Sequence, residues 1–336
     1  MTSCHHVLVV NGVVSQPLSD TPPISLFLQN HSGAYTTSRT HNGVSSLLFW
    51  DRHLLRLANS VKILLRNSPK WFGASPGTSI TESLIRPRLE DCLREGFPLA
   101  LKERERTGNQ EFVVTAFISA NSAASCGFDS YVHFGAYRPP AESGARLAIV
   151  GLGREIAAAK HSEWVRRRKH LEKLRPPLAT ELLLSNDGDQ ILEGSVTNFF
   201  AVCRRRETAG TPDDSRSSYP FEVQTAPLRD GVLPGIIRQL IIEVCSRKGI
   251  PFQEVAPSWS DRSWWVEAFI SNGLRLVQQV ELIQAPVSWE GLQSKTWEEV
   301  SWEEKRFEGS PLVTTEILKE IMELANSEGY PIKNFF

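Results

Sequence analysis

The sequence predicts a mixed α/β protein (α+β) built from two domains. Strand-like and helix-like segments alternate in both halves, and several strands follow one another through hairpin turns. The length of 336 residues is about twice that of a typical domain of ~150 residues. Arg138–Gly144, which reads RPPAESG, is rich in residues that suppress regular structure. We therefore expect an N-terminal α/β domain over residues 1–138, a linker over 139–144 and a C-terminal α/β domain over 145–336.

The N-terminal half opens with a hairpin and continues into helices. His6–Ser15 reads HVLVVNGVVS, and Asn-Gly between β-branched runs is a strong hairpin signal. Asp51 offers an N-cap for a helix that runs to about Arg66, with apolar residues at helical spacing. A second helical stretch is expected to break near Pro87 and Pro98, because proline disrupts helix interiors. The other segments are a strand at Ser45–Trp50, the second helix at Ser79–Glu105, and strands at Glu111–Ser119 and Ser130–Tyr137.

The C-terminal half alternates strands with helices. Asp187-Gly188-Asp189 separates two strand-like runs and indicates a further hairpin. Gly235–Lys248 has a helical pattern that ends at Gly249, a typical helix terminator. The polar stretch over 204–218 is interpreted as a loop. The remaining segments are strands at Ala145–Gly151, Glu181–Asp187, Gln190–Cys203, Phe221–Thr225 and Glu267–Ser271, and helices at Glu155–Lys173 and Thr314–Ser327.

The composition argues against several classes of protein. The 37 basic and 38 acidic residues nearly cancel, which gives no general attraction to nucleic acid or membrane. Five scattered cysteines without a CxxC pair disfavour a zinc site or a disulfide framework and suit a reducing compartment. The basic run Arg166–Lys169 is short and is followed by Glu172, which favours a solvated helix face over a nucleic-acid site. No apolar stretch or N-terminal signal indicates a membrane or secreted protein, so we expect a cytoplasmic one.

The most informative part of the sequence is a composite motif in the C-terminal half. Glu193–Asn198, EGSVTN, is followed directly by the apolar pair Phe199-Phe200. Val223-Gln224-Thr225 comes later, and Leu233–Arg238, LPGIIR, then opens a helix. This order resembles the signature of the class IV aminotransferases, which depend on pyridoxal phosphate. The gap between Phe200 and Val223 is longer than the family usually has, and we assign the excess to the 204–218 loop.

The resemblance implies a fold and an activity. The fold would be the two-domain fold type IV of D-amino acid aminotransferase, branched-chain aminotransferase and aminodeoxychorismate lyase, with pyridoxal 5'-phosphate at the domain interface. The function implied is transamination of a small-molecule amino substrate through a Schiff base on a lysine. Members of the family are usually homodimers, so a homodimer is expected here. The resemblance implies no nucleic-acid or membrane partner and no metal.

Two residues carry the central chemistry by this resemblance. Lys160 lies 33 residues before Glu193, the spacing at which the family places its Schiff-base lysine. Three alanines, Ala157–Ala159, precede it and would let a bulky cofactor approach the backbone. Glu193 would face the pyridine nitrogen and keep it protonated, so that the ring can accept electrons. Lys169 and Lys173 lie in a dense charged stretch and are interpreted as surface lysines.

The cofactor phosphate should be bound by helix N–H groups and an arginine. Gly235, Ile236 and Ile237 open a helix whose free N–H groups and positive dipole end suit an anion. The family's arginine lies in a His-x-x-Arg-Leu helix, which matches His53–Leu57 and places Arg56 in that role. The turn Asn272-Gly273-Leu274 is expected to add backbone N–H groups.

Three residues are expected on the substrate side. Tyr35 would point at the substrate, and Thr36 stands where aminotransferases of this group usually have glutamate. Trp164 follows the lysine where the family often has tyrosine, so a hydroxyl for the ring oxygen is missing.

Two alternatives to a transaminase remain open. Thr36-Thr37 and Asn272-x-Leu274 look closer to aminodeoxychorismate lyase, which cleaves a C–O bond and releases pyruvate on the same scaffold. A non-catalytic protein that retains the fold is the other. The presence of Lys160, Glu193 and Arg56 at the family's spacings argues against this second alternative.

Overall fold

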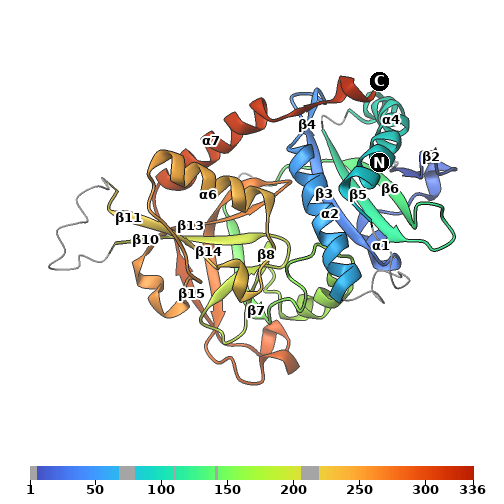
Figure 1. The fold of residues 1–336 in the computed structure, drawn as a ribbon. Coiled ribbons are helices and arrows are strands. Elements are labelled where there is room, and N and C mark those ends of the chain that lie inside the picture. The colour runs from blue at the N-terminus through green and yellow to red at the C-terminus, as the bar shows by residue number, and fades with distance from the viewer. Residues whose placement is uncertain (1–5, 68–79, 109–110, 141–142, 206–218) are drawn as a thin grey trace. The chain divides into compact units, whose positions relative to one another are not determined.

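The structure is a computed structural model that describes residues 6–67, 80–108, 111–140, 143–205 and 219–336 (Figure 1). Its contacts define two compact units, which are described separately. The first contains Met1–Pro139, Ala159–Arg167 and Leu324–Phe336, and the second contains Pro140–Ala158 and Arg168–Glu323. The first unit therefore includes two segments that follow the expected linker. The domain boundaries at 138 and 144 remain a prediction, and most of the 204–218 loop lies outside the described residues.

The first unit is built on a seven-stranded antiparallel sheet. The strand order is β16-β4-β3-β5-β6-β1-β2. The predicted N-terminal hairpin is confirmed, with Asn11 and Gly12 both at positive φ, as a tight two-residue turn requires. The strands are β1 (Val7–Val10), β2 (Val13–Val14), β3 (Ala34–His41), β4 (Ser46–Leu47), β5 (Phe112–Ala120), β6 (Phe128–Ala136) and β16 (Tyr330–Pro331).

Helices cover this sheet, and two of them differ from expectation. α2 (Trp50–Asn67) packs on β3, and its first turn already includes Asp51, which is therefore no N-cap. α4 (Glu82–Thr107) runs through both Pro87 and Pro98 without a break, so the expected interruption is wrong. Its buried face, formed by Ile85, Leu89, Cys92, Leu93 and Phe97, outweighs the cost of about 3 kcal/mol per proline. The unit also contains α1 (Ile24–Asn30), α5 (Glu163–Arg167) and 3₁₀ turns at Leu18–Asp20 and Ile332–Phe335.

The expected helix Glu155–Lys173 is largely absent. Only α5 is α-helical, and Arg168–Leu174 is a 3₁₀ helix. His161 instead forms an isolated antiparallel bridge with Ala34 at the start of β3, and the residues on either side of it bond to the backbone of Tyr35 and Gly33. The chain forgoes a helix there because β3 offers partners for its backbone groups.

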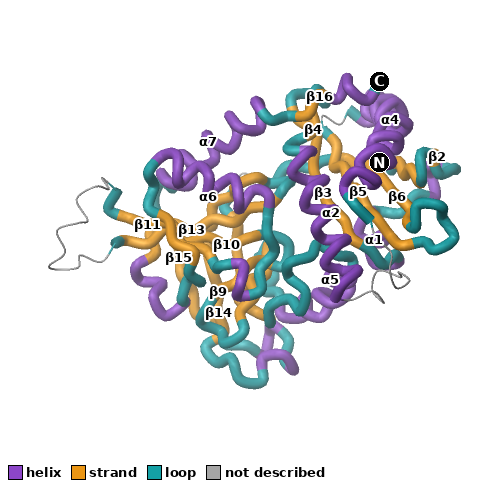
Figure 2. Tube along the Cα trace, viewed as in Figure 1, coloured by secondary structure: helices purple, strands orange, loops and turns teal. Residues whose placement is uncertain are grey.

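The second unit contains a mixed nine-stranded sheet that closes on itself (Figure 2). The order is β12-β11-β10-β13-β14-β7-β8-β9, and β9 also pairs with β10 through Glu193 and Asn198. The single strand expected at Gln190–Cys203 is two strands, separated by the Ser195–Thr197 turn. The strands are β7 (Ala145–Gly151), β8 (Glu181–Ser185), β9 (Ile191–Gly194), β10 (Asn198–Arg204), β11 (Phe221–Thr225), β12 (Phe252–Glu254), β13 (Trp265–Asn272), β14 (Leu276–Pro286) and β15 (Trp302–Arg306), which pairs with β14.

Two helices complete the second unit. α6 (Ile236–Lys248) packs on β13, starts after Gly235 and ends at Gly249 in the left-handed conformation, as predicted. α7 (Leu312–Ser327) belongs to this unit through Glu323, and its first turn donates to the Glu267 carboxylate. Short 3₁₀ turns occur at Leu228–Asp230, Trp259–Trp264, Leu292–Ser294 and Trp297–Glu299. None of the helices in the described residues has the length and apolarity needed to cross a membrane.

The glycine within α4 gives a test of packing against helix propensity. A Cβ at Gly96 would lie 2.2 Å from the Phe134 ring of β6. Alanine normally stabilises a helix by about 0.5–1 kcal/mol relative to glycine, whereas overpacking costs about 1–3 kcal/mol. We expect Gly96→Ala to lower the free energy of unfolding by about 1–2 kcal/mol in denaturant titrations. The double variant with Gly96→Ala and Phe134→Leu should lose less free energy of unfolding than the two single variants lose together. A more stable Gly96→Ala variant would contradict the packing.

Candidate active site

Lys160 is held by its backbone at the start of β3. Its N–H donates to Ser60 Oγ at 3.1 Å, and its carbonyl accepts the Tyr35 N–H at 3.0 Å. The side-chain Nζ lies 4.8 Å from the centroid of the Tyr35 ring. The structure thus brings together Lys160 and Tyr35, two of the residues expected at the site. The backbone of Lys160 is bonded to Ser60 of α2 on one side and to Tyr35 of β3 on the other.

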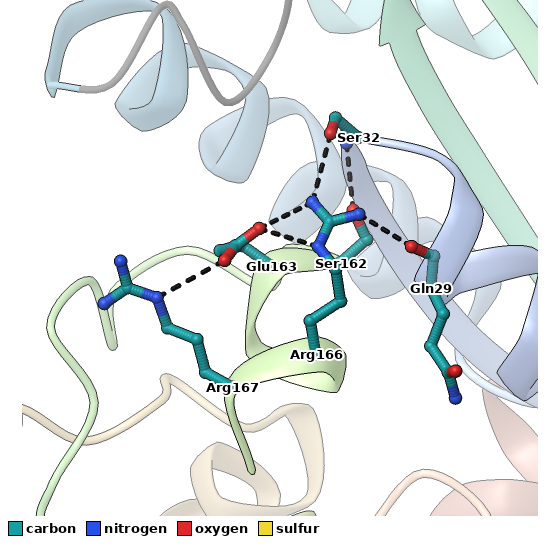
Figure 3. Close-up of polar contacts among 7 residues, drawn as sticks. Gln29, Ser32, Ser162, Glu163, Arg166 and Arg167 are labelled. Atoms are coloured by element: carbon teal, nitrogen blue, oxygen red, sulfur yellow. Dashed lines mark hydrogen bonds and ion pairs between the residues drawn. The ribbon is translucent and has the colours of Figure 1, made fainter. Parts of the chain in front are cut away.

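The residues after Lys160 lock this arrangement to the loop before β3 (Figure 3). Ser162 exchanges two hydrogen bonds with Gly33, one through its N–H and one through its hydroxyl, which accepts at 3.1 Å. Arg166 donates to the Gln29 carbonyl at 2.7 Å and to Ser32 Oγ at 3.1 Å, and it pairs with Glu163. This guanidinium, which sequence reasoning placed on a solvated face, joins α1, the loop and α5.

Trp164 lies in the same segment. It is the second residue of α5 and is buried. Its expected place on the substrate side remains a prediction.

Arg56 and Thr36 meet on the other face of β3. Arg56 donates from Nη2 to the Thr36 hydroxyl at 2.8 Å, and His53 Nδ1 lies 2.7 Å from the same oxygen. Burial and the positive charges of Arg56 and Lys160 hold the pKa of His53 well below its ordinary value of 6.5. His53 is therefore neutral at physiological pH, and Arg56 and Lys160 provide the positive charge of this region.

Glu193 is a fully buried carboxylate surrounded by donors. Arg154 Nε lies 2.9 Å from its Oε1, and the Leu233 N–H donates to its Oε2 at 3.0 Å. Asn198 contributes a longer bond of 3.5 Å and also donates to the Leu233 carbonyl at 3.0 Å. The adjacent guanidinium favours the ionised carboxylate, because a buried charge needs a partner. Arg154 was not singled out from the sequence, because nothing in its local pattern distinguishes it from a surface arginine.

The turn after Glu193 is tightly packed. A Cβ at Gly194 would lie 2.0 Å from Thr197 Oγ1, so only glycine fits. The Ser195 hydroxyl donates to Glu181 Oε1 at 2.7 Å, and Glu181 is itself buried. The glycine of the EGSVTN motif therefore serves to bring β9 and β10 close together.

The start of α6 presents unpaired donors. Gly235 is the N-cap without a side-chain cap, and its own N–H donates to the Leu233 carbonyl at 2.8 Å. Within the described parts of the chain, no acceptor pairs with the N–H groups of Ile236, Ile237 and Arg238. A Cβ at Gly235 would lie 2.0 Å from Asn198 Oδ1, so the position requires glycine. Buried N–H groups at a helix start without acceptors are suited to an anion.

Asn272 shapes the turn between β13 and β14. Its Oδ1 accepts the N–H groups of Leu274 at 3.0 Å and Arg275 at 2.8 Å, and its Nδ2 donates to the Val196 carbonyl at 3.4 Å. The side chain thus ties this turn to the EGSVTN turn. The expected phosphate contacts of Asn272, Gly273 and Leu274 remain a prediction, although the Leu274 N–H already has an acceptor.

A family model described as amino-transferase class IV matches residues 33–283, which is well over half of the chain. The chain belongs to the class IV aminotransferases. Membership confirms the predicted family, the enzyme class and pyridoxal 5'-phosphate as the cofactor. No curated protein matches the sequence of this class IV aminotransferase.

Solved structures confirm the fold of this class IV aminotransferase. A hypothetical aminotransferase from Mycobacterium tuberculosis in its apo form is 15% identical, with a TM-score of 0.64 over 96% of this chain and 99% of that one. A branched-chain aminotransferase from Thermoproteus uzoniensis is 16% identical, with a TM-score of 0.64 over 97% and 99%. A fold IV transaminase from Curtobacterium pusillum is 12% identical, with a TM-score of 0.63 over 94% and 99%. At these identities the likeness concerns the fold alone.

The Arg166 network predicts unequal effects at two neighbouring arginines. Arg166→Ala removes bonds to a carbonyl, a hydroxyl and a carboxylate, and should lower the free energy of unfolding by about 1–2 kcal/mol. Arg167 lies next to it, is 43% exposed and reaches Glu163 only at 3.4 Å. Arg167→Ala should change the free energy of unfolding by less than about 0.5 kcal/mol. Equal losses in denaturant titrations of the two variants would show that the Arg166 network stabilises the protein no more than the exposed Arg167 does.

Proposed function

We propose that this protein transaminates an amino acid, with Lys160 as the lysine that bonds to the cofactor and Glu193 as the carboxylate at its ring nitrogen. The observation that carries the proposal is the pairing of Glu193 with the Leu233 N–H, two residues before the N-cap of α6. A buried carboxylate of β9 is thus bonded to the segment that leads directly into a helix start with unpaired donors. These are the two features that the ring nitrogen and the phosphate of pyridoxal phosphate require.

The residues present fit the cofactor. The N–H groups of Ile236, Ile237 and Arg238 have no acceptor among the described residues, so a phosphate would satisfy donors that are otherwise buried at a cost. Arg56 adds a guanidinium suited to bidentate phosphate binding. When bound, pyridoxal phosphate supplies an electron sink that stabilises negative charge at the substrate Cα.

Glu193 has the task of holding the ring nitrogen protonated. Arg154 at 2.9 Å keeps the carboxylate ionised, and an ionised carboxylate accepts the ring N–H. Each carboxylate oxygen has more than one lone pair, so the existing bonds from Leu233 and Asn198 leave acceptor capacity. Asn198, after the turn, donates to this carboxylate at 3.5 Å and to the Leu233 carbonyl at 3.0 Å.

Lys160 would bond to the aldehyde carbon and move the Cα proton of the substrate through Nζ. Ser60 and Tyr35 hold its backbone through two hydrogen bonds. Tyr35, with its ring 4.8 Å from Nζ and largely buried, would exclude water from that amine.

The chemistry of the solved relatives supports an amino acid as substrate. The M. tuberculosis protein is described in a PLP-bound form and in a form with alpha-ketoglutarate and PMP, and the T. uzoniensis enzyme is described with norvaline. We extend this to the present chain as an amino acid donor and a keto acid acceptor. A homodimer and a cytoplasmic location are part of the same proposal.

A second candidate is a lyase that cleaves a C–O bond and releases pyruvate. The observation that favours it is the Asn272 turn, in which the side chain caps its own loop instead of the Ser/Thr-rich turn seen in many aminotransferases. Pyruvate release from aminodeoxychorismate without a half-reaction with any amino acid would establish this lyase. Conversion of the bound cofactor to its amine form by an amino acid would establish the transaminase.

Borohydride reduction of the holoenzyme tests the assignment of the lysine. We expect peptide mapping to place the reduced cofactor on Lys160, and Lys160→Ala to lower activity at least about a thousandfold. Lys169→Ala is the matched control, because that lysine is exposed on the following 3₁₀ helix, and it should retain activity. Modification at another lysine would refute the assignment. A protein that binds no cofactor at all would support the non-catalytic alternative.

A further inference from the structure

The hydroxyl of Thr36 contacts two side chains of α2, the cationic Arg56 and the buried His53. Successive residues of a strand point to opposite faces, so Tyr35 and Thr36 cannot serve the same side of β3. The Tyr35 ring lies against Lys160, whereas the Thr36 hydroxyl lies against Arg56 and His53 of α2. Thr36 is fully buried there. This places its side chain beside Arg56, the expected phosphate residue, and His53.

The direction of one hydrogen bond in this cluster is fixed. Arg56 can only donate, so Thr36 Oγ1 accepts from it at 2.8 Å. The same oxygen lies 2.7 Å from His53 Nδ1 and keeps a proton and a second lone pair for that contact. Burial and the nearby charges of Arg56 and Lys160 lower the pKa of His53, which favours a neutral ring.

Two side chains of α2 thus converge on the Thr36 hydroxyl. A neutral hydroxyl holds the Arg56 guanidinium without cancelling its charge, whereas a carboxylate at this place would form an ion pair. Thr36 therefore orients the guanidinium without adding a negative charge beside it.

We propose that Thr36 is a positioning residue for Arg56, and that it sets the affinity of the site for the phosphate of the cofactor. The proposal rests on the proposed function, in which Arg56 binds that phosphate. Thr36 acts through Arg56 and does not touch the substrate. Its hydroxyl, which also contacts His53 Nδ1, holds the guanidinium in one orientation.

The test compares two ligands that differ only in the phosphate. Dissociation constants for pyridoxal phosphate and for pyridoxal are measured on the apo forms of the natural protein, Thr36→Val and Thr36→Ser. We expect Thr36→Val to weaken pyridoxal phosphate roughly tenfold, about the contribution of one hydrogen bond to a charged group, and to leave pyridoxal unchanged. Thr36→Ser keeps the hydroxyl and should restore most of the affinity.

A buried threonine on the same face provides the control for folding. Thr40 is also fully buried, and its hydroxyl bonds to Glu111 and the Phe112 N–H, remote from Arg56. Thr40→Val should alter thermal unfolding without changing the ratio of the two dissociation constants. Equal weakening of both ligands by Thr36→Val, or no weakening, would overturn the proposal. If the natural protein binds no pyridoxal phosphate, the proposed function itself fails, which is a separate result.

Discussion

The buried ion pair between Arg154 and Glu193 is the interaction on which the candidate site in the second unit depends. Both side chains are almost completely buried, with Nε and Oε1 2.9 Å apart. An unpaired carboxylate at that depth would neutralise or unfold its surroundings. The Leu233 N–H and Asn198 complete its partners, and they join β9, β10 and the segment before α6. The Glu193 carboxylate thus bonds to β10 and to the segment that leads into α6, the helix whose first N–H groups lack acceptors among the described residues.

In the first unit, strand β3 organises the candidate site, because its successive side chains point to opposite faces. The Tyr35 ring contacts Lys160, and the Thr36 hydroxyl contacts Arg56, so two successive residues of β3 position the two cations expected at the site. The Lys160 segment is held by Gly33 and Tyr35, and Arg166 closes the loop that precedes them (Figure 3). Burial, followed by the charges of Arg56 and Lys160, holds the pKa of His53 well below its ordinary value.

The sequence predicts the fold where local signals and tertiary packing agree. Features that depend on residues close in the chain could be predicted from the sequence. These are the Asn11-Gly12 hairpin, the start and end of α6 at Gly235 and Gly249, and the order of the EGSVTN motif. The path of α4 through its prolines was not readable, since burial outweighs a local penalty. The backbone bonds around Lys160 and the partner of Glu193 were missed for a related reason: Gly33 and Arg154 act over long sequence separations. Motif spacing therefore locates Lys160 and Glu193, but not the residues that position them.

We propose that Glu193, held by Arg154, accepts the ring N–H of the cofactor and so keeps the pyridine nitrogen protonated. The most direct measurement is the ¹⁵N chemical shift of the pyridine nitrogen in holoenzyme reconstituted with ring-labelled pyridoxal phosphate, in the natural protein, Glu193→Gln and Glu181→Gln. Glu181 is a matched control, because it is buried on the neighbouring strand and bonds only to Ser195 and the Leu182 N–H among the described residues. We expect a protonated nitrogen in the natural protein and in Glu181→Gln, and a neutral nitrogen with at least about a hundredfold loss of activity in Glu193→Gln. A protonated nitrogen in Glu193→Gln, or a neutral one in the natural protein, would contradict this account.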